Sequence, residues 1–399
     1  MARFVPSDVT ELRDAVGDAL TAREPVEIVG GGTKRGLGRP LQTPRTIDLS
    51  RLSGIRDYAP SELVLTAGAG TPMAEIEAAL EANGQMLAFE PPDWRMLLGS
   101  AGDPTLGGVL ACNLSGSRRP KAGAARDHFL GFRAVSGRGE IFKAGGKVVK
   151  NVTGYDLCKL MAASYGTLAV LEEVTVKVLP RPETVETLLF ADLAPANATA
   201  LMSAALGSPH EVSGAAYLPQ PGAAGAQIVA LRVEGPAPSV AARRDSLVRE
   251  HAAAGVPGVL EGAASQMFWR DIGAASALAG VPEQAIWRVS VAPMRGVEVA
   301  VTVAGAIDAT WFLDWGGGLV WLAVPEAEDG GAAVIRTAIR GADGRGTGHA
   351  TLVRGSAGLR RSVPVFEPQP GALAALTRRV KEAFDPAHIF NPGRMAEGC

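Results

Sequence analysis

Residues 105–116 carry the clearest potential for ligand chemistry in this sequence. Five of these twelve residues are Gly, Ala or Ser, and three of the five are glycine. Glycine lets main-chain N–H groups approach a ligand without an intervening Cβ, while Asn113 and the hydroxyls of Thr105 and Ser115 supply uncharged hydrogen-bonding groups. We therefore expect this segment to contact a large, flat, phosphate-bearing cofactor rather than a metal ion or a protein partner.

A second glycine-rich segment lies near the N-terminus. Val26–Val29 is typical of a short strand, and it runs directly into Gly30–Gly36, a loop able to take positive φ at several consecutive positions. Successive N–H groups in such a loop form a concave anion site, although a flexible hairpin tip would have the same composition. The loop matches neither the phosphate loop of nucleoside triphosphatases nor the Gly-x-Gly-x-x-Gly turn of dinucleotide-binding folds, so it supports neither class.

The elements that must position these loops are short and of both kinds. A helix is expected to start at the N-cap Ser7 and to end before Pro25, and others are expected to begin at Thr71 and to cover 157–163. Apolar patterns predict strands at 47–49, 55–58, 63–67, 132–135, 140–143, 147–150 and 174–178. The first half of the chain is therefore expected to be an α+β domain.

Length and composition set the broad class of protein. A chain of 399 residues exceeds the usual single-core size, so two domains are expected. The 39 Lys and Arg residues nearly balance the 41 Asp and Glu residues, giving a formal net charge of -2, which argues against nucleic-acid binding. The first residues lack the pattern of a secretory signal, and no window has the roughly 18 to 20 apolar residues of a membrane span, so a cytoplasmic location is expected.

Cysteine usage bears on redox chemistry. The three cysteines, Cys112, Cys158 and Cys399, are too few and too widely spaced for a disulfide framework, a zinc site or an iron–sulfur cluster. An organic cofactor would therefore carry any electrons in this chain.

The order of several short motifs resembles the FAD-binding domain of the vanillyl-alcohol oxidase, or PCMH-type, superfamily. These motifs are Gly30-Gly31-Gly32-Thr33, Pro91-Pro92-Asp93, Thr105-Leu106-Gly107-Gly108 with Asn113 and Gly116, Arg126-Asp127, Gly154-Tyr155-Asp156-Leu157, Gly166-Thr167-Leu168 and the tail Phe390-Asn391-Pro392-Gly393-Arg394. Segments 111–116 and 149–160 are also similar to the FAD-binding E subunits of bacterial glycolate oxidases. The resemblance spans nearly the whole chain and is weakest between residues 185 and 340.

The resemblance implies a fold and a domain order. The fold is an α+β, PCMH-type FAD-binding domain of two α/β subdomains (1–182), a ferredoxin-like α+β cap (183–375) and a C-terminal segment returning to the FAD domain (376–399). In the cap, strand-like runs at 228–233, 287–291, 310–313 and 319–324 alternate with helical stretches at 195–206, 239–253 and 332–339. Five tryptophans lie in this region, where core packing or a partner-facing patch is an alternative to a substrate pocket: Trp269, Trp287, Trp311, Trp315 and Trp321.

The resemblance also implies which residues hold FAD. The loop at 30–33 would bind the pyrophosphate through backbone N–H groups, and the segments at 105–108 and 111–116 would run along the flavin and ribityl chain. For Asp156, a helix cap is the structural alternative. The full set of implied positions is Gly30, Gly31, Gly32, Thr33, Lys34, Pro92, Thr105, Leu106, Gly107, Gly108, Ala111, Asn113, Ser115, Gly116, Gly154, Asp156, Gly166, Thr167, Val174, Asn391 and Arg394.

Departures from the superfamily pattern matter for the chemistry. No His lies near Thr33 to tether the flavin, and Cys112 in an apolar turn is expected to be an inert buried thiol, so FAD should be non-covalent. Related D-lactate and glycolate dehydrogenase subunits hold a divalent metal with a His-x-His pair, which this sequence lacks. No metal ligand set is therefore expected.

Oxidation of a 2-hydroxy acid needs an Arg for the carboxylate and a base for the hydroxyl proton. Segment 348–354 is the only one that offers both residue types, as His349 and Arg354. On a regular strand these two side chains face opposite ways, so a bulge or twist would be needed for both to meet a substrate. The alternatives are a structural histidine and a surface or ion-pair arginine.

Two functional classes follow. In the first, the chain is an enzyme subunit that oxidises glycolate or D-lactate through FAD and passes electrons to an iron–sulfur subunit rather than to oxygen. It would sit beside a sibling flavoprotein and associate peripherally with the membrane through its partners. In the second, it is a non-catalytic flavin-bearing or structural subunit supporting that sibling. A stand-alone FAD oxidase that uses oxygen is a third interpretation.

Overall fold

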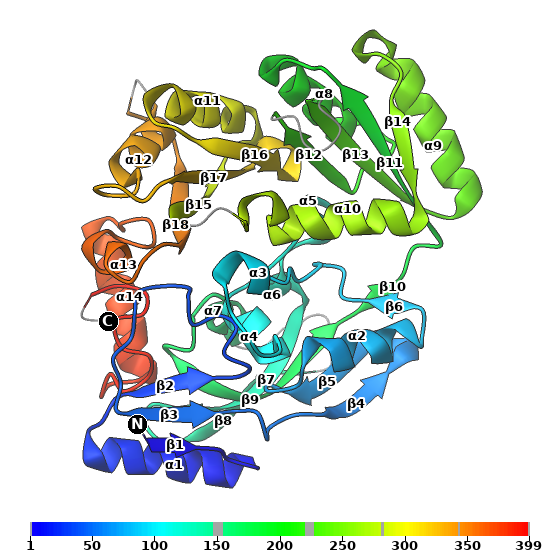
Figure 1. Ribbon diagram of the computed structural model, residues 1–399. Coiled ribbons are helices and arrows are strands. Elements are labelled where there is room, and N and C mark those ends of the chain that lie inside the picture. Colours follow the sequence, from blue (N-terminus) through cyan, green and yellow to red (C-terminus); the bar gives the residue numbers. More distant parts are fainter. Residues whose placement is uncertain (1, 147–154, 220–226, 281–282, 342–343, 398–399) are drawn as a thin grey trace. The chain divides into compact units, whose positions relative to one another are not determined.

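The computed structural model describes residues 2–146, 155–219, 227–280, 283–341 and 344–397, and it divides into two compact units (Figure 1). Unit 1 comprises Met1–Leu114, Gly123–Arg181 and Pro368–Cys399, and unit 2 comprises Ser115–Ala122 and Pro182–Glu367. Within the described ranges, no helix is long and apolar enough to cross a membrane.

Unit 1 contains a small parallel sheet and a larger antiparallel one. The parallel sheet has the order β1-β3-β2, from Ala2–Phe4, Arg45–Asp48 and Val26–Val29. The antiparallel sheet has the order β4-β5-β9-β7-β8, from Ile55–Ala59, Val64–Gly68, Ala169–Lys177, Phe129–Ser136 and Ile141–Gly145, and β6 (Gln85–Met86) pairs with β10 (Leu179–Pro180). The helices are α1 (Val9–Ala22), α2 (Met73–Glu81), α3 (Arg95–Leu98), α4 (Leu106–Ala111), α6 (Ala125–His128), α7 (Leu157–Met161) and α14 (Gly371–Phe384).

The N-terminal helix shows how local sequence fixes its start. Leu12, Val16 and Ala19 are buried along one face, as the apolar spacing predicts. The N-cap is Asp8 and not Ser7, because the Asp8 carboxylate accepts hydrogen bonds from the N–H groups of the next turn. Ser7 lies one residue outside and donates instead to the side chain of Glu11. The predicted cap was therefore wrong by one residue.

Unit 2 is built on one eight-stranded antiparallel sheet with the order β14-β11-β13-β12-β16-β17-β15-β18. Its strands are β11 (Thr184–Ala191), β12 (Gly214–Leu218), β13 (Ile228–Gly235), β14 (Gly258–Glu261), β15 (Gln284–Val291), β16 (Thr310–Asp314), β17 (Leu319–Pro325) and β18 (Gly348–Arg354). Its helices are α5 (Arg119–Ala122), α8 (Pro195–Gly207), α9 (Ala237–Glu250), α10 (Gly262–Ala274), α11 (Gly296–Ala306), α12 (Ala332–Arg340) and α13 (Leu359–Ser362).

The sheet of unit 2 is a tandem repeat of one motif. In chain order, β11-α8-β12-β13-α9-β14 and β15-α11-β16-β17-α12-β18 are each a βαββαβ unit of the ferredoxin-like kind. Their strand orders mirror one another, and β12 meets β16 at the centre of the sheet, where Tyr217 lies opposite Leu313. The ferredoxin-like expectation is confirmed, and the structure adds that the motif occurs twice.

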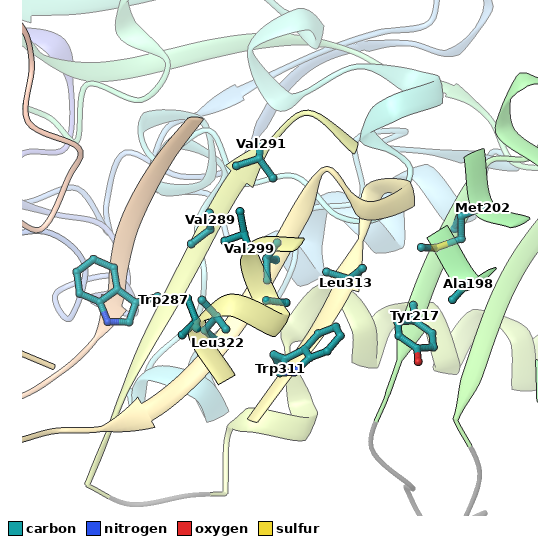
Figure 2. Close-up of a cluster of buried hydrophobic side chains, with 14 of the residues drawn as sticks. Ala198, Met202, Tyr217, Trp287, Val289, Val291, Val299, Trp311, Leu313 and Leu322 are labelled. Carbon is teal, nitrogen blue, oxygen red and sulfur yellow. The ribbon is translucent and has the colours of Figure 1, made fainter. Parts of the chain in front are cut away.

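One face of this sheet forms the apolar core of unit 2. Residues of α8, α9, α11 and α12 pack there against inward side chains of the strands, including Trp287, Leu313 and Leu322 (Figure 2). Trp287 is fully buried and donates through its indole N–H to the Gly330 carbonyl, 2.7 Å away. All five tryptophans expected in this region are buried, with Trp311 the most exposed at 8%. Trp287 and Trp311 therefore serve as core residues.

Each unit is assembled from segments that are separate in the sequence. The division after Arg181 lies next to the expected limit at residue 182, whereas Ser115–Ala122 leaves unit 1 and belongs to unit 2. All of α14 belongs to unit 1, so the C-terminal segment of that unit begins at Pro368, before the expected residue 376. The only buried side chain of this helix, Lys381, explains its place, because its ammonium donates to the carbonyls of Thr167 and Phe390 and to the Asp385 carboxylate.

Candidate functional site

A cavity in unit 1 joins three segments that the sequence places far apart. It encloses about 800 Å³ free of protein atoms, including its open mouth. Twelve of the predicted cofactor-binding residues line it: Gly30, Gly31, Gly32, Thr33, Lys34, Thr105, Gly107, Gly108, Ala111, Gly166, Asn391 and Arg394. A neighbouring cavity shares Gly30–Gly32, Arg35 and Thr105 with it and continues toward Arg3 and Glu75.

The glycine loop after β2 is shaped by close backbone contact. A Cβ on Gly31 would lie 1.7 Å from the carbonyl oxygen of Asp103, and one on Gly30 would lie 2.4 Å from Thr105 Oγ1. Gly32 takes a φ of 76°, a region that side chains disfavour. The loop therefore owes its glycines to packing against Asp103–Thr105 as well as to any ligand.

Helix α4 forms the second wall of the cavity. Thr105 caps the helix, accepting from the N–H of Gly108 at 3.4 Å. The missing Cβ of Gly107 points at Ala69, only 2.7 Å away, so a larger residue there would break the packing of α4 against the residue that follows β5. Gly108 instead faces the Lys34 side chain, whose Nζ would lie 3.7 Å from a Cβ. Gly108 is therefore the glycine of α4 that faces the loop at 30–36.

The C-terminal return supplies the third wall. The Asn391 side chain accepts from the Ile28 N–H at 3.0 Å and donates to the Tyr165 carbonyl at 2.8 Å, so it ties β2 to the turn at residues 164–167. A Cβ on Gly166, which has a φ of 68°, would lie 2.8 Å from the Asn391 amide nitrogen. Asn391 therefore holds the cavity wall together.

Arg394 stabilises the glycine loop from within the protein. Its guanidinium donates to the carbonyls of Arg35 and Leu37 at 3.0 and 2.9 Å and forms an ion pair with Glu27 at 3.3 Å. Burial lowers the pKa of Arg394, yet these carbonyl and carboxylate partners keep the charge compensated. Its hydrogen bonds therefore stabilise the backbone of the glycine loop.

Lys34 lines this cavity together with two other cationic residues, Arg35 and Arg394. Desolvation lowers the pKa of the Lys34 ammonium, which donates to the Thr33 hydroxyl at 3.1 Å. Among the residues that the structure describes, no carboxylate lies within ion-pair distance of Lys34 Nζ. A desolvated cation in a glycine-lined cavity fits an anionic, phosphate-bearing ligand.

Cys112 also reaches the cavity and is half-buried. Burial raises the pKa of its thiol to about 11, so the group is protonated at neutral pH despite the nearby charge of Lys34. The low reactivity expected for this thiol follows from that shift.

Eight predicted cofactor-binding residues do not line the cavity, and Gly154 lies outside the described residues. Leu106 and Val174 are core residues with 0% exposure. Of the remaining six, Asn113 accepts a hydrogen bond from the Arg126 N–H, and Thr167 donates one to the Ser164 carbonyl. Ser115 and Gly116 are buried in unit 2. Pro92 is half-buried in the loop before α3, and Asp156 is exposed. Asp156 stands at the start of α7, but its side chain makes no cap hydrogen bond.

The cavity also uses residues that the sequence interpretation did not select. They are Ile28, Val29, Arg35, Leu49, Ala69, Ser164, Tyr165, Ala169 and Leu171. Four of them are apolar strand residues, and Leu49 and Ala69 directly follow strands, so their pattern is the same in any core. Tyr165 differs, since its φ of 53° is unusual for a large residue and marks a constrained turn.

The two predicted catalytic residues lie on β18 of unit 2. His349 pairs with Ser290 and Arg354 with Ile286, and the register shifts between Ile286 and Trp287. This bulge adds one residue to β18, so Arg354 comes to the same face of the sheet as His349. The Arg354 guanidinium donates to the Ala279 carbonyl at 3.0 Å, which gives it a structural partner at the far end of the strand.

Similarity to known proteins identifies the family of this chain. The model of the FAD binding domain family matches residues 2–145. The glycolate oxidase subunit GlcE of Escherichia coli K12 is 36% identical over 387 residues, which cover 96% of this chain and 96% of that protein. The chain belongs to the FAD-linked oxidoreductases of the PCMH type.

Other proteins are similar to this chain over a smaller part of the sequence or in fold alone. The glycolate oxidase subunit GlcD of Bacillus subtilis 168 is 32% identical over 47% of this chain and 39% of its own length. The solved structure of p-cresol methylhydroxylase with substrate bound superposes with a TM-score of 0.68 over 99% of this chain and 88% of that one, at 13% identity. The FAD binding domain gives FAD as the cofactor of the present chain, and the glycine-lined cavity with Lys34 is compatible with it.

Among the described residues, no group of three or more His, Cys, Asp and Glu side chains is arranged to hold a metal ion.

Proposed function

We propose that this chain is the FAD-binding subunit of a glycolate-oxidising complex and that it holds FAD non-covalently in the cavity of unit 1. The observation that carries the proposal is Lys34, a desolvated cation that has no carboxylate partner among the described residues and lies in a cavity walled by glycines. The likeness to GlcE along 96% of both chains supports the complex and the substrate class.

The roles of the cavity residues follow from their chemistry. The N–H groups at 30–33 would bind the pyrophosphate, and Lys34 would compensate negative charge on the cofactor. Gly108 and Ala111 on α4 would lie along the isoalloxazine and ribityl groups, because small side chains permit flat contact. No histidine is among the described lining residues, and the protonated Cys112 thiol is a poor nucleophile, which supports a non-covalent flavin.

When bound, FAD would accept a hydride equivalent from the α-carbon of the 2-hydroxy acid, which leaves as the 2-oxo acid. The protein must then bind the carboxylate, receive the hydroxyl proton and exclude water. The electrons would pass to an iron–sulfur partner rather than to oxygen, because the three cysteines of this chain cannot hold a cluster of their own. A sibling flavoprotein, a cytoplasmic location and peripheral membrane association through partners complete the proposal.

The test is anaerobic mixing of the purified, FAD-loaded chain with glycolate. Bleaching of the flavin absorbance is expected, followed by reoxidation only when an artificial acceptor is added. D-lactate mixed in the same way would define the substrate range. Failure of both acids to bleach a stoichiometrically loaded flavin would contradict catalysis by this chain.

A second candidate function is a flavin-bearing subunit that does not oxidise substrate itself. It is favoured by one sequence observation, the absence of a His-x-His pair. In that case glycolate would bleach the flavin only in the assembled complex. Rapid formation of hydrogen peroxide by the lone chain would instead support a stand-alone oxidase.

A further inference from the structure

The C-terminal clasp, residues 385–394 of unit 1, lies against the strand that leads into the glycine loop. Phe390 forms an isolated parallel bridge with Val26 of β2. The Val26 N–H donates to the Ile389 carbonyl at 2.7 Å, and the Val26 carbonyl accepts from the Asn391 N–H at 3.0 Å. The clasp therefore continues the hydrogen bonding of the β1-β3-β2 sheet past β2, and it fixes the backbone from which the glycine loop begins.

Lys381 of α14 joins this clasp to the turn at residues 164–167. Its ammonium donates to the Phe390 carbonyl of the clasp at 3.1 Å and to the Thr167 carbonyl of the turn at 2.6 Å. The Thr167 hydroxyl in turn donates to the Ser164 carbonyl at 2.7 Å, which closes the turn. Three residues of that turn line the cavity: Ser164, Tyr165 and Gly166. One buried ammonium therefore holds two segments that are more than 200 residues apart in the sequence.

Asp385 compensates this charge from inside the clasp. Its carboxylate forms an ion pair with Lys381 at 2.5 Å and accepts from the N–H groups of Ile389 and Phe390 at 3.1 and 2.8 Å. The two charged residues are 3% and 0% exposed, so solvent does not replace a lost partner. A Cβ on Gly137 would lie 2.4 Å from the Asp385 carboxylate, so the turn between β7 and β8 packs directly against the pair. A buried pair with these partners ties the clasp to one position.

The ion pair lies behind the cavity wall. Neither Lys381 nor Asp385 is among the described residues that line the cavity, whereas the clasp brings Asn391 and Arg394 to it. The Asn391 amide donates to the Tyr165 carbonyl at 2.8 Å, so the clasp and the turn meet again at the cavity itself. Loss of the ion pair would therefore let two parts of the same wall separate.

We propose that the Lys381–Asp385 ion pair positions the cavity walls for FAD and so sets how tightly the cofactor is held without touching it. The inference rests on the proposed function in one respect, the placement of FAD in the cavity of unit 1. Walls that are in place before binding increase affinity, because each segment that must be ordered on binding costs free energy. The pair supplies this order by fixing the clasp and the turn through one set of buried bonds.

The test separates FAD affinity from stability with the double variant Lys381→Met/Asp385→Asn. The exchange removes both charges, keeps the apolar stem of the lysine and keeps an amide oxygen for the N–H groups of the clasp. Replacing both partners of a buried ion pair is often close to neutral for stability, whereas loss of one partner is not. Titration of the FAD-free protein, followed by flavin fluorescence, should show FAD bound at least about tenfold more weakly.

Leu12→Ala is the matched control in unit 1. Leu12 is a fully buried residue of α1 and is not among the described lining residues of the cavity. The control should unfold at a lower temperature than the double variant, because it leaves an apolar void, and yet bind FAD within about twofold of the unchanged protein. A control that loses as much affinity as the double variant would show that any loss of stability weakens FAD, and it would overturn the positioning role.

Hydrogen exchange of the FAD-free protein gives a readout that does not depend on the cofactor. In the double variant, the amides of Tyr165, Thr167 and Asn391 should exchange at least about tenfold faster than in the unchanged protein, whereas those of β7 should keep their rates. Should the double variant fail to fold, Asp385→Asn alone serves in the same assays, with effects of the same sign and smaller size. Unchanged FAD affinity in a folded variant, or unchanged exchange at all three amides, would overturn the proposal.

Failure of the proposed function gives a different pattern. If Lys34→Met, which alters the cavity itself, does not weaken FAD binding, the cofactor lies elsewhere and the placement in unit 1 fails. If Lys34→Met weakens FAD binding and the folded double variant does not, the placement stands and the positioning role of the ion pair fails.

Discussion

The cavity of unit 1 and a cluster of large side chains around Trp315 in unit 2 are built by opposite means. The cavity depends on backbone, since Gly31 and Gly107 allow main-chain segments to approach within distances that a Cβ would forbid. The cluster depends on large side chains, since Arg119, Arg288 and Trp315 converge from three separate elements.

This difference shows which kind of site leaves a recognisable motif in the sequence. Backbone recognition needs glycines next to one another in the sequence, so it leaves a local motif. Side-chain recognition needs only single residues on different elements, so it leaves no motif at all. Four predictions probe this contrast, beginning with the substitution of largest expected effect.

Gly31→Ala should damage the cavity most. Its Cβ would lie 1.7 Å from the Asp103 carbonyl oxygen, so the loop must move, at a cost of about 3 to 5 kcal/mol in unfolding free energy with loss of FAD. Denaturant unfolding and flavin content measure both effects. Gly17→Ala in α1, where nothing lies within 4 Å of the new Cβ, is the control and should stabilise by about 0.5 to 1 kcal/mol. Equal stability of the two variants would contradict a backbone-built cavity.

Asp314→Ala should damage the cluster next most strongly. It leaves the buried Ser117 hydroxyl and the Trp315 N–H without their acceptor, which should cost about 2 to 3 kcal/mol in unfolding free energy. FAD content should be kept, because Asp314 belongs to unit 2 and the cavity residues belong to unit 1. Loss of FAD without a loss of unfolding free energy would contradict this separation of the two regions.

Lys34→Met tests the charge in the cavity. Burial lowers the pKa of this lysine, so its charge reduces the unfolding free energy of the FAD-free protein at neutral pH. This loss becomes smaller as pH rises through the folded-state pKa toward the ordinary lysine value. The FAD-free Met variant should therefore be more stable than the unchanged protein near neutral pH, and the difference should shrink as the solution becomes alkaline. FAD should dissociate about 10- to 100-fold more readily from the variant, as flavin fluorescence on dilution would show.

His349→Gln should have the smallest effect. Desolvation and the positive charges of Arg288 and Arg119 lower the pKa of this histidine, so the unfolded chain takes up its proton first and stability falls as pH drops below the ordinary histidine value of about 6.5. The variant should lose less thermal stability than the unchanged protein between about pH 7.5 and about pH 5.5. A parallel pH profile for both proteins would remove His349 from the field of the two arginines.

Local patterns predicted most of the elements. The strand at Val26–Val29 and the helices α8 and α12 were predicted within a few residues, because their apolar patterns match the repeat of each element. The helix α4 was not predicted, since its glycines carry no helical pattern and Thr105 caps it only in the folded chain. The contact of Gly107 with Ala69 was not predicted either, because it depends on how two separate segments pack.

Other features required the folded chain. The tandem βαββαβ arrangement depends on the pairing of β12 with β16, which brings together residues nearly a hundred positions apart. The bulge in β18 places Arg354 on the face of His349, whereas simple alternation predicted opposite faces. Neither feature has a local sequence signal, because each depends on the partner strand.

The sequence by itself determined the cofactor class, the family and most secondary structure, because glycine spacing and apolar periodicity are local properties. The tertiary structure alone decided which glycines face Asp103 and Ala69, that Lys34 is a desolvated cation, and that Arg119, Arg288 and Trp315 meet in unit 2. The physical reason is that burial, ion pairing and cation–π contact depend on distances between elements, and only packing sets those distances.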